Sequence, residues 1–376
     1  MKRLTIAYLI LLINLSVAGR NLVAAPSGTP SADGTLASPL DIQTALKRLQ
    51  PSDSLFLRGG TYYLAQTLTI HAPGSVTHNT YIGAYADERP IWDFRQQPHY
   101  KNGVTLSSDR VHLRGITICY AGYKGIICTA SNCILEGLDV YGCCDSGIQM
   151  KGGHSNLITH CDSHDNFDYT TAQADTPDFG GNADGFADKQ YTGTPGNIYV
   201  RCRAWGNSDD GWDFFQRVGG TTLLIQCECR SNGPQWYDLS HHPRRQTDSD
   251  FLNGFDGEGK ILTFRGSKKP VVCTLTHFVN NGNGNGFKLG GANTQHDVEL
   301  RNCLSLGNTV KGFDQNSNAG RMTLLDCIAE GNGKNFGFYK DNGYTLHIEG
   351  CHSLGSHTAD TFHGGSISQE RNSWNK

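Results

Sequence analysis

The sequence lacks a marked excess of charge of either sign. Its 376 residues include 32 Lys and Arg against 35 Asp and Glu, which gives a formal net charge of -3 at pH 7. A chain so close to neutrality has no electrostatic basis for binding nucleic acid or an anionic membrane surface. We therefore expect neither as a partner.

Long apolar runs are also scarce. Apart from residues 4–17, no stretch approaches the 18 apolar residues that a membrane-spanning helix needs. That stretch follows Lys2 and Arg3 and precedes small residues up to Ala25 that offer cleavage sites. This arrangement predicts a signal peptide over residues 1–25, with an uncleaved membrane anchor as the alternative. No cysteine follows it that could carry a lipid anchor, so we expect a secreted or periplasmic protein, free of the membrane after cleavage.

Proline is modest, at 12 residues, whereas glycine is abundant, at 46, and follows no collagen period. Many Gly and Asn residues among short apolar runs are typical of a turn-rich β protein. Length alone would favour two or three domains, but a chain of stacked repeats can form one domain at this length. We expect a single domain over residues 26–376.

A repeat becomes visible after Val111. Its signature is Cys-x-x-x-x-Asn, often followed by a glycine and an apolar residue, and the last cysteines are evenly spaced. The signature occurs at Cys161 to Asn166, Cys202 to Asn207, Cys227 to Asn232, Cys303 to Asn308 and Cys327 to Asn332. Each unit thus contains a short strand, a turn with Asn and a second short strand. Such units without helical periodicity predict an all-β fold, a parallel β-helix.

Stacking would place equivalent residues of successive coils side by side. The Asn side chains can then bond to one another along the axis. We expect the repeat cysteines, with Cys351, to form a buried column of free thiols. Disulfides remain an alternative where cysteines crowd together, at Cys143, Cys144, Cys227 and Cys229. Residues 41–49 read as an amphipathic helix with Asp41 as its N-cap, and we expect this helix to cap the N-terminal end of the stack.

Residues 233–280 interrupt the repeat. The segment is too long for one turn of a coil and is rich in aromatic and basic residues. A long insertion in a solenoid often lies over the binding face, so we expect this one to shape a substrate cleft. An ordinary surface excursion is the alternative.

Two acidic turns carry the strongest chemical signal. Asp184 precedes Gly185 and Asp210 precedes Gly211, so stacking places both in one column, with Asp209 and Asp213 beside it. Clustered carboxylates repel one another unless a cation holds them, and Ca²⁺ prefers such oxygen ligands. The spacing is not that of an EF-hand loop. The alternative is a set of turn residues bonded to the backbone.

A lysine follows in the same register. Gly286 and Phe287 match the glycine–apolar pair of the acidic turns, so Lys288 would stand beside the acidic cluster. A lysine there could act as a base if its pKa is lowered. We expect the aromatic residues of this column, Trp212 and Phe287, to fill the core rather than to stack on a ligand.

Three runs resemble one known family. They are GNADGFADK at 181–189, SDDGWDFF at 208–215 and NGNGFKLGG at 283–291, and the chain is similar to polysaccharide lyase family 9 over most of residues 110–345. The resemblance implies a right-handed parallel β-helix that cleaves pectic galacturonan. It further implies Ca²⁺ bound by Asp184, Asp209, Asp210 and Asp213, with Lys288 as the Brønsted base. The insertion departs from the pectate-cleaving pattern, which leaves homogalacturonan and rhamnogalacturonan I both open as substrates.

The expected chemistry is β-elimination by a monomeric enzyme. Cationic side chains near the cleft would pair with further uronates, and the candidates are Arg217, Arg244, Arg245 and Lys311. Two other function classes remain open. One is a glycoside hydrolase of the same fold, which needs two suitably spaced carboxyl groups. The other is a non-catalytic carbohydrate-binding solenoid, which would have no need of Lys288.

Overall fold

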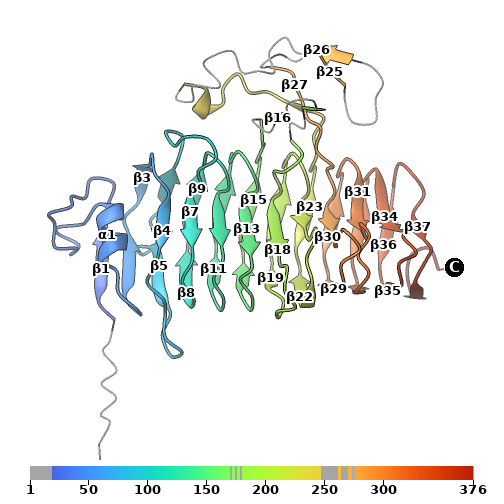
Figure 1. Cartoon of the computed structure of the whole chain (residues 1–376), viewed down its shortest axis with the longest axis horizontal. Coiled ribbons are helices and arrows are strands. Elements are labelled where there is room, and N and C mark those ends of the chain that lie inside the picture. Colours follow the sequence, from blue (N-terminus) through green and yellow to red (C-terminus); the bar gives the residue numbers. More distant parts are fainter. Residues whose placement is uncertain are drawn as a thin grey trace, which may run out of the picture.

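The computed structural model describes residues 19–169, 172–173, 176–177, 180–246, 261–263, 270–272, 274 and 276–375. Most of the predicted signal peptide, residues 1–18, therefore lies outside the described residues. Within the described part the chain winds into a parallel β-helix whose coils succeed one another along the long axis of the molecule (Figure 1). No helix in this part combines the length and apolarity needed to cross a membrane.

Each coil contributes strands to three long parallel sheets. Sheet 1 contains β1 (Asn21–Ala24), β2 (Ser54–Leu57), β5 (Thr80–Ala84), β8 (Val111–Arg114), β11 (Ile134–Glu136), β14 (Leu157–Thr159), β19 (Ile198–Val200), β22 (Gly219–Ile225), β29 (His296–Arg301), β32 (Arg321–Leu325), β35 (Thr345–Glu349) and β38 (Ser366–Glu370). Sheet 2 contains β4 (Leu68–Ile70), β7 (Val104–Leu106), β10 (Ile126–Cys128), β13 (Ile148–Lys151), β18 (Phe186–Lys189), β21 (Trp212–Asp213), β28 (Phe287–Lys288), β31 (Lys311–Asp314), β34 (Lys334–Phe338) and β37 (Thr361–Phe362). Sheet 3 contains β3 (Gly60–Tyr63), β6 (Pro90–Asp93), β9 (Thr117–Cys119), β12 (Asp139–Tyr141), β15 (Asp162–His164), β20 (Arg203–Trp205), β23 (Glu228–Arg230), β30 (Leu304–Leu306), β33 (Ile328–Glu330) and β36 (His352–Leu354). The predicted all-β class is confirmed.

A short helix stands at the N-terminal end of the stack, as the sequence predicts. It is α1 (Ile42–Arg48), and the Asp41 side chain accepts a 2.9 Å hydrogen bond from the Thr44 backbone N–H at its N-cap. Ile42, Ala45 and Leu46 are buried in the core. The helix thus covers apolar surface that an open terminal coil would expose (Figure 1).

The cysteine column predicted from the repeat is present. Its cysteines directly precede aligned strands of sheet 3, and they are fully buried free thiols: Cys161, Cys202, Cys227, Cys303, Cys327 and Cys351. The disulfide alternative is not realised, because Cys143, Cys144 and Cys229 are free as well. The residue before each column cysteine has a positive φ, as in His160 (52°) and Arg201 (52°), which turns the chain sharply from sheet 1 into sheet 3.

Two further ladders run through the core. Along the Asn column each side-chain amide donates to the next, as from Asn166 to Asn207 (2.8 Å) and from Asn207 to Asn232 (3.0 Å). The aromatic residues of sheet 2 stack in the same way: Phe186 on Trp212 at 4.4 Å between ring centroids, and Trp212 on Phe287 at 5.1 Å. Both Trp212 and Phe287 are fully buried, which confirms that they fill the core. These ladders fix the register of the coils that carry the site.

The insertion leaves the solenoid after sheet 3, and its described residues form short elements. These are β24 (Trp236–Tyr237) paired with β27 (Phe278–Val279), η1 (Pro243–Gln246), and β25 (Ile261–Thr263) paired with β26 (Pro270–Val272). A further pair, β16 (Ala172–Gln173) and β17 (Thr176–Pro177), belongs to the coil before the first acidic turn. In Figure 1, β25 and β26 lie to one side of the stacked coils. Much of the predicted cleft-shaping segment lies outside the described residues.

Candidate active site and metal centre

The strand register of sheet 2 brings the two acidic turns together. Phe186 of β18 pairs with Trp212 of β21, so the residues two positions earlier, Asp184 and Asp210, are neighbours in one column. The Gly185 backbone N–H donates to the Asp210 carbonyl at 2.9 Å, which holds this alignment. The column relation predicted from the glycine spacing is therefore confirmed.

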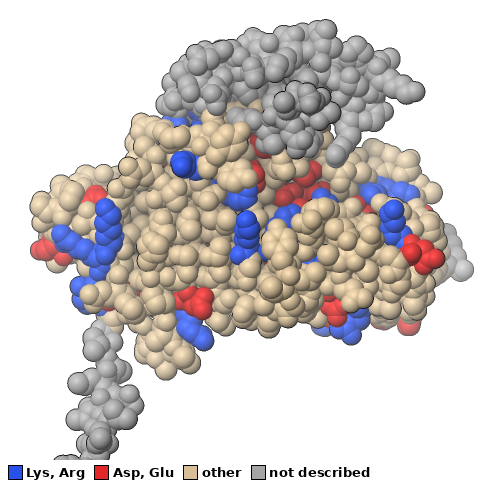
Figure 2. Space-filling view, in the orientation of Figure 1, with Lys and Arg blue, Asp and Glu red and all other residues tan. Residues whose placement is uncertain are grey.

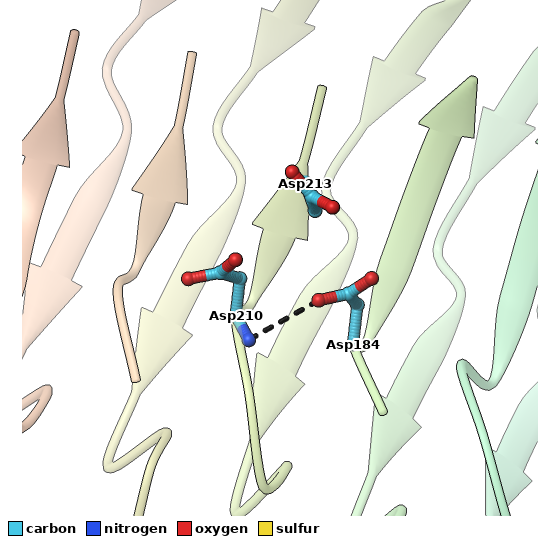
Figure 3. A group of neighbouring side chains, drawn as sticks. All are labelled: Asp184, Asp210 and Asp213. Atoms are coloured by element: carbon cyan, nitrogen blue, oxygen red, sulfur yellow. Dashed lines mark hydrogen bonds between the residues drawn. The ribbon is translucent and has the colours of Figure 1, made fainter. Parts of the chain in front are cut away.

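Three carboxylates converge at this point (Figure 3). Asp184, Asp210 and Asp213 each offer an oxygen, and the three oxygens lie within 4.8 Å of one another. All three residues are buried, with Asp210 fully so. Asp184 Oδ1 accepts from the Asp210 backbone N–H at 3.2 Å, which fixes its orientation (Figure 3).

The fourth predicted ligand, Asp209, belongs to the same pocket but not to this group of three. Its Oδ1 accepts a hydrogen bond from the Asn283 backbone N–H. Asp209 is 5% exposed and lines the pocket beside Asp213. A carboxylate on the pocket wall adds negative charge to the centre even where it does not join the trio.

Two ammonium groups face the carboxylates. Lys288 Nζ lies 2.9 Å from Asp210 Oδ2 and 3.4 Å from Asp213 Oδ1. Lys189 Nζ pairs with the other oxygen of Asp213. Both lysine side chains are mostly buried, at 12% and 15% exposed. Lys288 thus stands beside the acidic cluster, where the register predicts it.

The charges of the pocket leave room for a divalent cation. The carboxylates of the acidic centre outnumber the ammonium groups that face them: Asp184, Asp209, Asp210 and Asp213 stand against Lys189 and Lys288. The donors of the trio are all carboxylate oxygens, which suit a hard cation such as Ca²⁺ or Mg²⁺. The residues present therefore fit a bound divalent cation held by Asp184, Asp210 and Asp213.

Burial and charge pull the pKa values of the two lysines apart. Burial lowers the pKa of Lys189 to about 8, although nearby carboxylates oppose the shift. Burial also acts to lower the pKa of Lys288, but the carboxylates of Asp210 and its acidic neighbours outweigh it, so this pKa is raised. Burial raises the pKa of Asp184 well above its usual range. A cation on the trio would neutralise the charges that keep Lys288 protonated.

A pocket of about 360 Å³ opens over these groups. Its lining runs over successive coils of sheet 2, from Lys124 at one end to Lys288 at the other. Figure 2 shows acidic side chains gathered over the middle of the solenoid, with basic side chains beside them. The pocket is thus an elongated polar cleft of mixed charge, suited to a polar chain molecule rather than to an apolar ligand.

One predicted substrate contact is wrong. Arg217 is fully buried inside the coil, where its guanidinium pairs with Asp188 at 2.5 Å and donates to Thr222 Oγ1 at 2.9 Å. It offers no surface to a polymer. The sequence shows a cation two residues after Phe215 but not that the chain turns inward there.

Arg244 is also fully buried and does not face the cleft. Its guanidinium donates to the backbone carbonyls of Phe94, Gln97 and Tyr120 at 2.7–3.2 Å. Its role is to fasten the insertion to earlier coils, which corrects the prediction of a substrate contact. The side chain of Arg245 lies outside the described residues.

Lys311 occupies the column of the acidic pair, two coils beyond Asp210. Its Nζ lies 2.9 Å from Asp314 Oδ2, and its side chain is 18% exposed. It faces the surface of sheet 2 but is not part of the pocket lining. Its role as a contact for a long substrate stays a prediction.

Sequence reasoning missed the polar residues that orient the carboxylates. Ser146 Oγ donates to Asp184 Oδ2 at 3.1 Å, and the Asn285 amide donates to Asp210 Oδ1 at 2.7 Å. Both stand two residues before the apolar residue of their coil, in the same column as the aspartates. The glycine–apolar pairs of the repeat could have identified them.

Comparison with known proteins gives a consistent result. A family model described as "Pel9A-like, right handed beta helix region" matches residues 22–255 and 266–353. Pectate lyase L of Paenibacillus polymyxa (strain SC2) is 30% identical over 346 residues, which are 86% of this chain and 66% of that protein. Pectate lyase L of Dickeya dadantii (strain 3937) is 28% identical over 326 residues, with 84% and 66% covered. The chain thus spans just under two thirds of the length of these relatives.

Solved structures agree on the fold. The crystal structure of pectate lyase Pel9A superposes with a TM-score of 0.76 at 26% identity, and covers 96% of this chain and 80% of that one. A structure titled rhamnogalacturonan lyase superposes with a TM-score of 0.72 at 20% identity, covering 95% and 88%. At that identity the second likeness concerns the fold alone. The handedness predicted for the solenoid is that of the matching family model.

Proposed function

Because the chain belongs to the family of Pel9A-like right-handed β-helix proteins, we propose that it is a polysaccharide lyase that cleaves a galacturonate-containing pectic polymer by β-elimination. The name pectate lyase, which the two curated relatives and the Pel9A structure carry, supports the class of substrate. The observation that carries the proposal is the position of Lys288, whose Nζ lies 2.9 Å from a carboxylate of the acidic centre. A base beside a cation site is what proton abstraction next to a carboxylate needs.

The acidic centre is proposed to hold Ca²⁺. Asp184, Asp210 and Asp213 would be its protein ligands, with Asp209 contributing charge or a fourth oxygen. When bound, the cation supplies Lewis-acid stabilisation of the negative charge that develops on the substrate carboxylate. The protein contributes three pre-oriented carboxylates, of which Asp184 and Asp210 are fixed by the hydrogen bonds of Ser146 and Asn285.

Lys288 is proposed to remove the proton. In its neutral form Nζ takes the proton on the carbon next to the uronate carboxylate. The electron pair of that C–H bond forms a carbon–carbon double bond, and the bond to O4 breaks with its electron pair on the departing oxygen. That oxygen takes a proton from solvent, and the new chain end is an unsaturated uronate. No covalent enzyme intermediate is needed.

The remaining proposals concern the location of the protein, its oligomeric state and its substrate. The N-terminal residues are proposed to direct secretion, and the protein is proposed to act as a monomer. The insertion is proposed to cover the cleft, and homogalacturonan and rhamnogalacturonan I are both candidate polymers. Lys311, whose side chain is partly exposed, is proposed as a contact for a long substrate.

One assay tests the proposal. Purified protein is incubated with homogalacturonan and with rhamnogalacturonan I, with added Ca²⁺ or with chelator, and near-ultraviolet absorbance of the unsaturated product is followed. We expect absorbance to rise on at least one polymer and chelator to abolish the rise. New reducing ends without absorbance would instead establish a hydrolase. Binding of polymer without any cleavage would establish a non-catalytic solenoid.

A further inference from the structure

A third lysine stands on the wall of the pocket, away from the acidic trio. Lys124 lies two residues before Ile126 of β10, and therefore in the same column as Ser146 and Asp184. Ladder hydrogen bonds keep this register, since the Gly125 N–H donates to Ser146 O at 3.2 Å and the Gly147 N–H to Asp184 O at 2.9 Å. Two ladder steps separate Lys124 from Asp184, or about 10 Å along the axis.

The Lys124 ammonium is held in place, but its described contacts do not use all of its hydrogen-bond donors. Its Nζ lies 2.8 Å from Asp145 Oδ1 and 3.5 Å from the centroid of the Tyr123 ring. An ammonium has three N–H donors, and these contacts engage two of them among the described residues. Lys124, Tyr123 and Asp145 all line the pocket. The third donor is therefore available to a ligand that enters the pocket.

Folding stability does not account for this arrangement. The Lys124 and Asp145 side chains are only 10% and 6% exposed, so both charges have lost most of their hydration. A buried ion pair of this kind gives little net stability compared with apolar side chains of similar size. A fixed cation on the wall of a polar cleft is, in contrast, a ready partner for an anionic ligand.

The direction of the pocket identifies which part of a ligand would meet Lys124. The lining runs from Lys288 across the coils of Asp213, Lys189 and Gln149 to Lys124. These are four ladder steps, or about 19 Å along the axis. A linear polymer with one uronate at the acidic trio can therefore lie along the axis with later sugars directed toward Lys124.

We propose that Lys124 forms a distal subsite that binds the carboxylate of a second uronate of the same chain. This proposal rests on the proposed lyase function, because it takes a pectic polymer as the ligand. Asp145 holds the ammonium in position and presents its second oxygen to a sugar hydroxyl, and Gln149 lines the stretch between the two subsites. Lys124 thereby sets specificity for polymers that carry an acidic sugar at this distance from the cleaved unit.

Binding, rather than turnover, tests the subsite. Calorimetric titrations would use the Lys288→Arg background with added Ca²⁺, so that ligand binding is read without turnover. The ligands are long oligomers of galacturonan and rhamnogalacturonan I, and the same oligomers with their carboxyl groups reduced to alcohols. We expect Lys124→Met to weaken binding of the better acidic oligomer about ten-fold or more, as for loss of a charge-assisted hydrogen bond. Binding of the reduced oligomer should change little, and Lys124→Arg should retain most of the affinity.

Two controls distinguish loss of the subsite from other causes of weaker oligomer binding. Lys334→Met removes a charge from the same column beyond the opposite end of the pocket, where Nζ donates to the Ala359 carbonyl at 2.6 Å, and it should leave binding unchanged. If Lys124→Met does not fold because Asp145 is left unpaired, the double variant Lys124→Met/Asp145→Asn provides the measurement. Equal losses for acidic and reduced oligomers, or no loss for either, would overturn the subsite. A wild type that makes no unsaturated product would instead refute the lyase function, whatever these titrations show.

Discussion

Lys288 is the register partner of Asp213 in the parallel ladder between β21 and β28, and its Nζ lies 3.4 Å from Asp213 Oδ1. The distance between the proposed base and the acidic centre is therefore set by backbone pairing and not by a loop. The aromatic stack beneath, in which Trp212 lies on Phe287, supports the same pair of strands from the core. Such a rigid support suits a site that must hold a base close to a cation.

The first prediction concerns this base. Lys288→Arg keeps the positive charge but cannot give it up at usable pH, because guanidinium does not deprotonate there. We expect turnover of pectic polymer to fall to near background, with folding and Ca²⁺ binding retained. Wild-type turnover should rise with pH, since only the neutral amine accepts a proton. Initial rates across neutral and alkaline pH provide the measurement.

Lys189→Arg is the matched control for that experiment. Lys189 also pairs with Asp213, and burial lowers its pKa to about 8. If Lys189 serves only as a charge, its arginine variant keeps part of the turnover. Substantial turnover in Lys288→Arg together with its loss in Lys189→Arg would transfer the role of base to Lys189.

The fold and the centre of the site are predictable from the sequence because both depend on short-range periodicity. A glycine followed by an apolar residue recurs in successive coils around the site, and stacking turns this spacing into the column that joins Asp184 and Asp210. The cysteine column follows from the same register. These relations need only the assumption that equivalent residues stack.

The predictions that fail concern side-chain direction. Arg217 and Arg244 are cations in the right segments, but one points into the coil toward Asp188 and the other toward the backbone of earlier coils. Neither direction has a periodic signal, because each depends on several contacts that do not recur from coil to coil. The position of Lys124 could not be predicted for a related reason: its partner, Asp145, lies in another coil.

A second prediction concerns the cation. Asp210→Asn keeps the shape of the side chain but removes one charged ligand from the trio, so affinity for Ca²⁺ should fall strongly. A cation that binds the folded state raises the melting temperature. We expect added Ca²⁺ to raise the melting temperature of the wild type and to have little effect on Asp210→Asn. Asp162→Asn, which alters an aspartate paired with an exposed arginine, is the control and should respond like the wild type. A full response in Asp210→Asn would remove this residue from the metal site.

A third prediction concerns stability and pH. His164 lies between two carboxylates, with Nε2 3.0 Å from Asp139 Oδ1 and Nδ1 2.7 Å from Asp165 Oδ2. Burial opposes protonation, but these two hydrogen bonds raise the pKa of His164 to about 9. The folded pKa exceeds the unfolded value of about 6.5. The stabilisation is therefore complete below about pH 6.5 and is lost as pH rises through about 9.

Comparison with a variant that cannot titrate isolates this effect. His164→Phe retains a ring able to stack on Trp205, which lies 4.2 Å away between centroids in the wild type. The melting temperature of the wild type should exceed that of His164→Phe at pH 6, and the difference should shrink toward pH 10. In a background with Asp139→Asn and Asp165→Asn the advantage of histidine at pH 6 should be lost, because burial alone disfavours the charged ring. A pH-independent difference in the wild-type background would show that stacking, not charge, is what His164 provides.

The last prediction concerns the attachment of the insertion. Arg244 donates to the carbonyls of Phe94, Gln97 and Tyr120 from a fully buried position, so it bridges the insertion to coils more than one hundred residues earlier. Arg244→Met leaves these buried carbonyls without their donor, and we expect the free energy of unfolding to fall by about 2–4 kcal/mol. Arg203→Met is the matched control, because Arg203 pairs with Asp162 at the surface and is 52% exposed, so its loss should cost less than about 1 kcal/mol. Denaturant unfolding of both variants gives the comparison, and limited proteolysis shows where the chain loosens. Cleavage of Arg244→Met within residues 233–280 is expected before the solenoid is cut, whereas equal small losses in both variants would mean that other contacts fasten the insertion.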